Sequence, residues 1–159
     1  MSIVIRLVED RDLPTLASIR AREWETRSYW EHRIARYLGG ELSPQQALSA
    51  RAAFVAEQDG EIVGFVAGHL TRRHGCEGEL EWINVSEEHR GVGIAGKLFE
   101  TMAGWFIAQE ARRVCVNVAP ENAAARGLYG NAGAERLNEY WMIWQDIAAS
   151  RARFVARKG

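Results

Sequence analysis

A glycine-rich segment at residues 89–98 has the composition of a phosphate-binding loop. Its sequence, HRGVGIAGKL, lies between a segment with strand character and a long helical pattern. Glycines let the backbone turn tightly and approach a ligand closely. The N–H groups of the following helix's first turn would point outward, where the helix dipole favours an anion. The segment could therefore cradle a diphosphate, although a helix that merely begins with glycines has the same pattern.

The spacing of Gly91, Gly93 and Gly96 also fits the G-x-G-x-x-G pattern of dinucleotide-binding proteins. In that class the glycines directly follow the first strand, and an acidic residue ends the next strand about 20 residues later. Here residues 86–90 separate the strand from the glycines, and the next strand ends near Val118 without an acid. Both criteria exclude a dinucleotide site.

Two motifs resemble those of the GNAT superfamily of acyl-CoA-dependent N-acyltransferases. Residues 90–95 resemble its Arg/Gln-x-x-Gly-x-Gly/Ala pyrophosphate loop, and residues 122–133 resemble its Asn-x-x-Ala-x-x-x-Tyr-x-x-x-Gly motif. The opening strand and helix are similar too, so the resemblance runs from about residue 3 to about residue 144. It implies an α/β fold (α+β in some schemes). Its mixed, mostly antiparallel central sheet is flanked by helices, and a splayed strand pair forms the acyl-CoA cleft.

The resemblance implies acetyl-CoA as the acyl donor. The pyrophosphate would lie on the amides of the glycine loop, and the pantetheine arm would pair like an extra strand with the preceding strand. Asn122 would hydrogen-bond the arm, and Tyr129 would protonate the departing thiolate. The implied cofactor site comprises Ile83, Asn84, Val85, Arg90, Gly91, Val92, Gly93, Ile94, Ala95, Gly96, Asn122 and Tyr129.

Acetyl transfer from a thioester to an amine needs three kinds of group. A base or a water relay must take a proton so that the neutral amine can attack. An N–H donor must stabilise the oxyanion, and a strand amide near residues 83–85 is suitably placed. An acid must protonate the leaving thiolate, and a phenol such as that of Tyr129 can donate that proton.

Glu79 and Glu81 are the candidates for the base. They are two residues apart on one predicted strand, so both should project to the same face. Mutual repulsion and burial would then raise one pKa, which suits a base, and the pair would attract a cationic amine. The alternative is a pair of solvated carboxylates, and a strand irregularity could change the facing.

Aromatic residues outside the two motifs are candidates for the acceptor pocket, because aromatic side chains often shape small-molecule sites. They come from the first two helices and the last predicted hairpin. The alternative is that they belong to the ordinary core. The candidates are Trp24, Tyr29, Trp30, His32, Tyr140 and Trp141.

Periodicity and turn signals predict the elements that position these residues. The segment Asp59-Gly60, between two β-rich runs, predicts a hairpin. We expect strands at 3–7, 54–57, 62–70, 79–85, 113–118, 134–137 and 140–144, and helices at 13–21, 29–38, 43–50, 92–110 and 122–131. Hairpins followed by β-α-β crossovers imply a mixed sheet with helices on both faces.

Length and charge limit the remaining possibilities. The 159 residues suit one acyltransferase domain, predicted at 1–146, followed by a basic tail at 147–159 that we expect to be frayed and solvated. Residues 1–150 hold 16 basic and 21 acidic residues, so a nucleic-acid partner is not expected. No apolar stretch approaches the roughly 18–20 residues that span a bilayer, so no membrane association is expected.

Cysteine and histidine usage points to neither disulfides nor a metal site. Cys76 and Cys115 are far apart, which suits a reducing compartment, and no signal-peptide pattern is seen, so a cytoplasmic location is expected. His69, His74 and Cys76 are close in sequence but lack the spacing of metal ligands, so no metal is expected.

The sequence therefore predicts an N-acetyltransferase. The expected reaction is direct transfer from acetyl-CoA, in a ternary complex, to a primary amine of a small molecule or to a peptide or protein amino group. The alternative is a non-catalytic sensor of acyl-CoA with the same fold. The resemblance also allows a homodimer.

Overall fold

A single seven-stranded sheet organises the chain, and the computed structural model describes residues 2–21 and 25–158. The strands are β1 (Ile3–Leu7), β2 (Ala47–Gln58), β3 (Glu61–Thr71), β4 (Gly78–Val85), β5 (Val114–Asn117), β6 (Glu135–Arg136) and β7 (Trp141–Trp144). Their order is β1-β2-β3-β4-β5-β7-β6, and every neighbouring pair is antiparallel except β4 and β5. The predicted mixed, mostly antiparallel sheet is confirmed.

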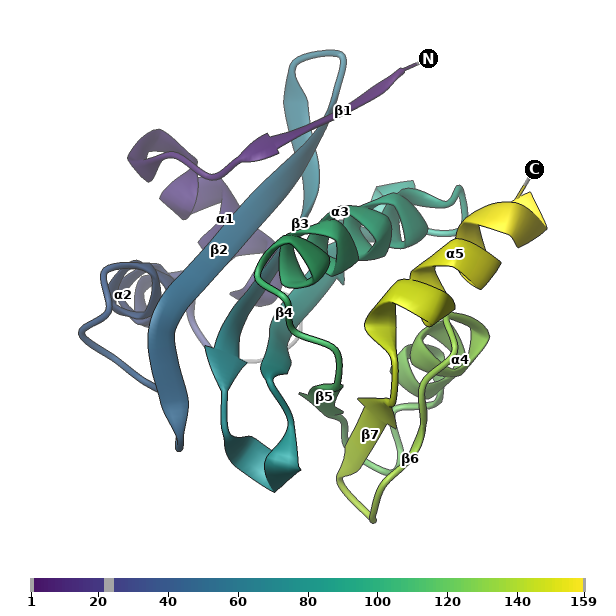
Figure 1. Cartoon of the computed structure of the whole chain (residues 1–159). Helices are drawn as coiled ribbons and strands as arrows, with labels where there is room; N and C mark the ends of the chain where they lie inside the picture. The colour runs from purple at the N-terminus through teal and green to yellow at the C-terminus, as the bar shows by residue number, and fades with distance from the viewer. Residues whose placement is uncertain (1, 22–24, 159) are drawn as a thin grey trace.

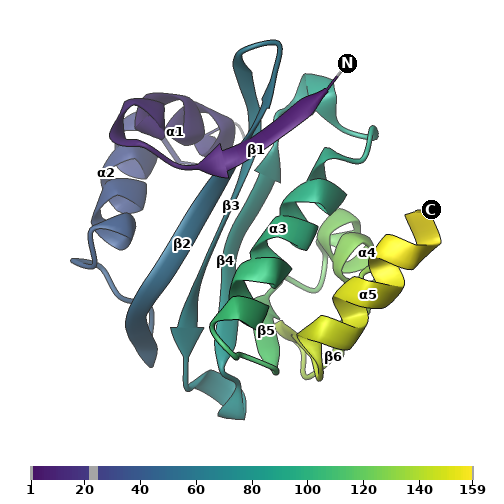
Figure 2. The same ribbon diagram turned by 45° about the horizontal axis from the view of Figure 1, so that its top comes forward.

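Helices cover both faces of this sheet. α1 (Leu13–Ala21) and α2 (Arg27–Leu38) lie on one face, and α3 (Ile94–Ala108), α4 (Ala123–Asn131) and α5 (Ile147–Lys158) gather on the other (Figure 1, Figure 2). Short 3₁₀ turns, η1 (Asp10–Asp12), η2 (Arg73–Gly75) and η3 (Glu87–His89), occur in the connections. Within the described ranges, no helix has the length and apolar character needed to span a membrane.

Each face of the sheet has its own apolar core. On the α3 face, Leu98 and Phe106 pack with Leu80 and Trp144. On the α1–α2 face, residues including Leu16, Ile34, Phe65 and Trp82 form a second buried cluster. Strand β4 contributes to both cores and lies at the centre of the sheet, so its geometry is fixed from both sides.

The hairpin predicted at Asp59-Gly60 is confirmed. Asp59 has φ 53° and Gly60 has φ 80°, and two successive positive φ angles fit the turn whose twist suits a two-residue hairpin. The turn joins β2 and β3, whose residues Gln58 and Glu61 pair directly.

The helix expected at 43–50 is wrong, because β2 begins at Ala47 and pairs there with Thr71 of β3. A serine–proline pair is a local helix signal, and the long-range pairing of two strands overrides it. Positions 47–50 therefore extend the sheet instead.

The frayed tail expected at the C-terminus is also wrong, although most of residues 151–156 are exposed. Its residues form helix α5, whose Ile147 is 1% exposed. The Arg151 guanidinium donates to the Glu100 carbonyl of α3 at 2.9 Å, and the Phe154 ring packs on Phe99 with centroids 5.3 Å apart. The basic residues in this segment therefore belong to an amphipathic helix that covers α3.

Ile147→Ala is expected to lower the free energy of unfolding by about 2–5 kcal/mol, because it leaves a cavity in a buried site. Urea unfolding would measure this change. Val155, 42% exposed on the same helix, is the matched control, and Val155→Ala should change stability by less than about 0.5 kcal/mol. Equal effects of the two variants would show that α5 is not docked in solution.

Candidate active site

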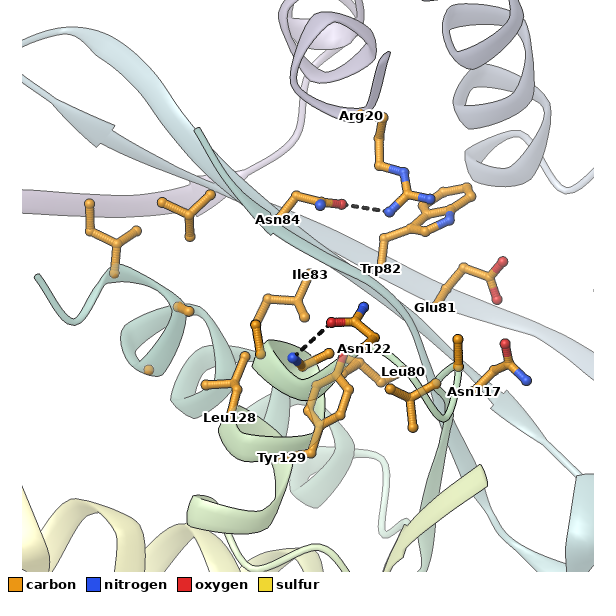
Figure 3. Close-up of a pocket in the computed structure, with 18 of the residues that line it drawn as sticks. Arg20, Leu80, Glu81, Trp82, Ile83, Asn84, Asn117, Asn122, Leu128 and Tyr129 are labelled. Carbon is orange, nitrogen blue, oxygen red and sulfur yellow. Dashed lines mark hydrogen bonds between the residues drawn. The ribbon is translucent and has the colours of Figure 1, made fainter. Parts of the chain in front are cut away.

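A cleft opens where β4 and β5 part. The two strands pair between Gly78–Leu80 and Val114–Val116, but β4 continues to Val85 while β5 ends at Asn117. A cavity of about 1160 Å³ lies at this opening, and Figure 3 shows its walls. It is bounded by β4, by the start of α3 and by the β5–α4 connection. The predicted splayed strand pair is therefore present.

The glycine loop forms one end of this cavity. Gly91 and Gly93 have φ angles of 84° and 87°, and Gly93 immediately precedes α3 as its N-cap. Residues 94–96, the first turn of α3, also line the cavity. The Val92 side chain is 68% exposed and is not among the described lining residues. The loop thus presents a helix N-terminus to the cavity, which is a favourable environment for an anion.

Arg90 ties the glycine loop to β4. Its Nε donates a hydrogen bond to the Val85 carbonyl at 3.0 Å, which holds the loop against the end of the strand. Ile83, Asn84 and Val85 line the cavity beyond the point where β4 leaves β5. The two parts of the predicted cofactor site are therefore continuous.

Asn122 and Tyr129 reach the cavity from α4. The Asn122 side-chain oxygen accepts from the Ala125 amide at 3.1 Å and caps the helix. Tyr129 points from α4 towards β4 (Figure 3), and its ring packs edge-on against Trp144 with centroids 5.7 Å apart. Burial raises the pKa of the Tyr129 phenol, which keeps it in the protonated form that can donate a proton.

A β-bulge in β4 lies beside the two carboxylates. Ala67 of β3 pairs with Trp82, whereas Gly68 pairs with Leu80, so Glu81 is an extra residue on β4. Leu80 and Trp82 consequently belong to cores on opposite faces although they are two residues apart. Polar atoms of Glu79, Glu81 and His69 lie within 4.8 Å of one another, so the two carboxylates share one face as strand alternation predicts, and it is Trp82 that the bulge turns to that face.

Glu79 is held in place by its neighbours. It is 3% exposed, its Oε1 accepts from Arg73 Nε at 3.1 Å, and the same oxygen lies 3.5 Å from His69 Nε2. The fully buried His69 is bound in turn through Nδ1 to the Tyr37 hydroxyl at 2.8 Å. Glu79 is therefore the inner carboxylate of a buried polar network.

Glu81 is placed differently. Its side chain is 12% exposed, and its closest cation is Arg33 of α2, at 3.9 Å between nitrogen and oxygen. Burial raises the pKa of the Glu81 carboxyl, and the neighbouring Glu79 adds to this effect. Both carboxylates line the cavity, and the nearest guanidinium nitrogen lies farther from Glu81 than from Glu79.

Sequence reasoning missed several residues at this end of the cavity or buried behind it: Arg20, Arg33 and Arg73 line the cavity, whereas Tyr37 and His69 are not among its described lining residues. Tyr37 and Arg33 come from α2, Arg73 from η2, and Arg20 from α1. His69 is directly opposite Glu79 in the pairing of β3 and β4, and a histidine inside the apolar run at 62–70 was the available signal. The set His69, Glu79 and Glu81 could ligate an ion, but Arg73 and Arg33 already supply positive charge beside the two carboxylates.

His74 and Cys76, which are close to His69 in the sequence, lie elsewhere. The His74 ring packs on Trp141 with centroids 4.7 Å apart. Cys76 is buried beside Cys115, and their interaction raises the pKa of the Cys115 thiol. Cys76 therefore belongs to a small core cluster with Cys115 and Ile143.

Some of the aromatic residues predicted for the acceptor pocket line the cavity, and others do not. Trp30 and Trp141 line the cavity. Tyr29 is exposed and packs its ring edge-on against Trp30, while Tyr140 is 51% exposed and contributes its carbonyl to the Val118 amide. Tyr29, Tyr140 and the exposed His32 are not among the described lining residues. Trp24 lies outside the described residues.

Solved structures share this architecture. A GNAT-family protein from Desulfovibrio desulfuricans superposes with a TM-score of 0.76 at 13% identity, covering 92% of this chain and 99% of that one. The PaiA N-acetyltransferase of Thermoplasma acidophilum, solved in complex with coenzyme A, gives a TM-score of 0.67 at 16% identity, covering 90% and 98%. The chain therefore has the fold of this class of transferases.

Sequence comparison identifies the family. The profile of the acetyltransferase (GNAT) family matches residues 13–134, so the chain belongs to that family. L-2,4-Diaminobutyric acid acetyltransferases of Chromohalobacter salexigens and Halomonas elongata are 32% and 30% identical to it over 89 residues. These matches cover 56% of this chain and 44% of each relative, so they span less than half the length of those relatives.

Proposed function

We propose that this protein transfers the acetyl group of acetyl-CoA directly, in a ternary complex, to a primary amine of a small molecule or of a peptide or protein. The observation that carries the proposal is one continuous cavity, with the glycine loop at one end and the carboxylate pair at the other. Family membership and the relatives named diaminobutyric acid acetyltransferases support this reaction. A cytoplasmic location, a homodimer and a single acyltransferase domain at 1–146 remain predictions.

The glycine loop fits the diphosphate of acetyl-CoA. A Cβ added at Gly91 or Gly93 would meet no described atom within 4 Å, so the space beside both glycines is open. Amides of residues 90–96 would bind the pyrophosphate, and the edge of β4 at residues 83–85 would pair with the pantetheine arm. The Asn122 oxygen already caps α4, so its side-chain nitrogen is the donor that it can offer to the arm.

Different residues of the cavity would carry out the two proton transfers that the reaction requires. When bound, acetyl-CoA supplies a thioester carbonyl as the electrophile and a thiolate as the leaving group. Glu81 accepts a proton from the acceptor's ammonium group, directly or through a water. A β4 amide stabilises the charge that develops on the carbonyl oxygen, and Tyr129 donates its phenolic proton to the departing sulfur.

An acyl-CoA sensor of the same fold is the second candidate. A sensor needs the glycine loop. It needs neither a phenol at the thioester nor a base at the acceptor end of the cavity, which is the end that holds Glu79 and Glu81. Tyr129 and Glu81 both line the cavity, and this favours turnover over sensing. Release of free thiol from acetyl-CoA in the presence of amines would distinguish the two functions.

Calorimetric titration should show that acetyl-CoA binds with a dissociation constant near the micromolar range, which corresponds to a binding free energy of about −8 kcal/mol. NAD and ATP should bind far more weakly. Gly93→Ala should weaken acetyl-CoA binding at least tenfold, because a side chain at this φ strains the loop that presents the amides.

Gly60 provides the matched control for the loop variant. It has a similar φ of 80° and equally open surroundings, but it lies in the β2–β3 turn. Gly60→Ala should cost similar stability and leave acetyl-CoA affinity unchanged. A Gly93→Ala protein that binds acetyl-CoA as tightly as the parent would contradict the assignment of the glycine loop.

A further inference from the structure

The acceptor end of the cavity carries charges of both signs. Glu79 and Glu81 come from β4, and the guanidinium groups of Arg20, Arg33 and Arg73 come from three other elements. Figure 3 shows Arg20, Trp82 and Glu81 on the same side of β4, away from Tyr129. With both carboxylates ionised, these five side chains leave an excess of one positive charge. A partly desolvated site with this excess favours a ligand that brings a negative charge.

Two of the three arginines are already engaged by the protein. Arg73 donates to Glu79 at 3.1 Å and lies over the Trp141 ring at 4.8 Å. Arg20 donates to the Asn84 side-chain oxygen at 2.8 Å and lies over the Trp30 ring at 4.3 Å. Their contacts hold these two cations against the walls of the cavity.

Arg33 has donors left for a ligand. It reaches the cavity from α2, and its distance of 3.9 Å from Glu81 exceeds that of a hydrogen bond. Its buried Nε has no hydrogen-bond partner among the residues that the structure describes. A guanidinium group has five N–H donors in a planar fork that matches a carboxylate. The Arg33 side chain is 34% exposed, so an oxyanion on the ligand can accept from its terminal N–H groups.

We propose that the acceptor is an amine that also carries a carboxylate, such as an amino acid or a diamino acid. Arg33 binds the acceptor's carboxylate, and Glu81 receives a proton from its ammonium group. The short separation of Arg33 and Glu81 lets one small zwitterion contact both side chains. This inference rests on the proposed acetyl transfer and adds the class of acceptor.

The reaction balances with these groups. A bond forms between the amine nitrogen and the acetyl carbon, and the bond between that carbon and sulfur breaks. Of the two protons that the ammonium nitrogen loses, one leaves through Glu81 to solvent. The other replaces the proton that Tyr129 gives to the sulfur. The products are an N-acetyl amino acid and the free thiol of coenzyme A.

Matched acceptors test the carboxylate requirement. 2,4-Diaminobutyrate and 1,3-diaminopropane differ by one carboxylate, as do lysine and 1,5-diaminopentane, and alaninamide replaces the carboxylate of alanine by an amide. With acetyl-CoA as donor and thiol release as readout, kcat/KM for the carboxylated member of at least one pair should be higher by about 10- to 100-fold. This range is that of a charge-assisted hydrogen bond.

Variants of α2 assign the preference to one side chain. The ratio of interest is kcat/KM for the carboxylated acceptor divided by kcat/KM for its uncarboxylated partner. Arg33→Gln should reduce this ratio to about one. Arg33→Lys should keep part of the preference because the positive charge remains. Arg36 lies on the same helix, is exposed and is not among the described lining residues. Arg36→Gln should therefore leave the ratio unchanged.

Each outcome has a separate meaning. Acetylation of both members of every pair at similar rates, or faster acetylation of the diamines or of alaninamide, would overturn the inference and leave the proposed transferase function intact. An unchanged ratio in Arg33→Gln would overturn the role of Arg33. Binding of acetyl-CoA without acetylation of any of these amines would overturn the proposed function and the inference with it.

Discussion

Tyr129→Phe is expected to lower kcat by about 10²- to 10⁴-fold, the range typical for loss of a positioned general acid. The phenol reaches the cavity from α4, and burial keeps it protonated by raising its pKa. Phenylalanine keeps the ring and its packing against Trp144, so the fold should be preserved. Steady-state thiol release would measure the loss, and calorimetry should show acetyl-CoA affinity close to that of the parent.

Tyr140→Phe is the control for removal of a phenolic hydroxyl. Tyr140 is half exposed and is not among the described lining residues, so its variant should keep full turnover. If Tyr129→Phe also turned over at the parent rate, the phenol would have no part in the reaction. A proportional loss of acetyl-CoA affinity would instead indicate a binding role for the hydroxyl.

That the glycine loop, Asn122 and Tyr129 would lie near one another could be predicted from the sequence because their signals are local. The glycine loop and the start of α3 occupy seven consecutive positions, 90–96, and the Asn122 and Tyr129 pair lies on one short helix. Helix caps, glycine turns and short-range periodicity depend on neighbours within a few residues. Such features are readable without knowledge of which strands pair.

The acceptor end depends on contacts between distant segments and could not be predicted in this way. Tyr37 and His69 are 32 positions apart and meet because α2 packs across β3. Trp82 lies on the α1–α2 face, beside the two carboxylates, because of a bulge that appears in the register between Ala67 and Gly68 of β3. The sequence showed that Glu79 and Glu81 could share a face, but their different surroundings required the pairing of β3 with β4 and the packing of α2.

The C-terminal helix shows how composition can conceal a packing signal. Four basic residues dominate the segment after Ser150 and indicate exposure. Ile147 and Phe154 are seven residues apart, a spacing that places both on one face of a helix. That face packs on α3, while Arg153 is exposed and Arg151 bonds to a carbonyl of α3. Periodicity was therefore the better guide than charge.

Glu81→Gln is expected to lower kcat/KM by about 10²-fold or more, which is the lower range for loss of a general base. Glu81 acts as a base only when deprotonated, so kcat/KM should rise as pH increases through its pKa. Because burial raises that pKa, this rise should lie above the range of an ordinary glutamate. Glutamine has no proton to release, so the rise should disappear from the pH profile of the variant. A second rise at higher pH, from deprotonation of the amine itself, should remain.

Glu79→Gln separates the two carboxylates. Glu79 is buried against Arg73 and His69, so its loss removes a charge-assisted hydrogen bond and should lower the free energy of unfolding by about 1.5–3 kcal/mol. The low-pH rise in kcat/KM should persist in the folded variant, because Glu81 is still present. Disappearance of that rise in Glu79→Gln, together with its persistence in Glu81→Gln, would exchange the two roles. If both variants kept the rise and the parent rate, the proton would leave through a water relay that depends on neither carboxylate.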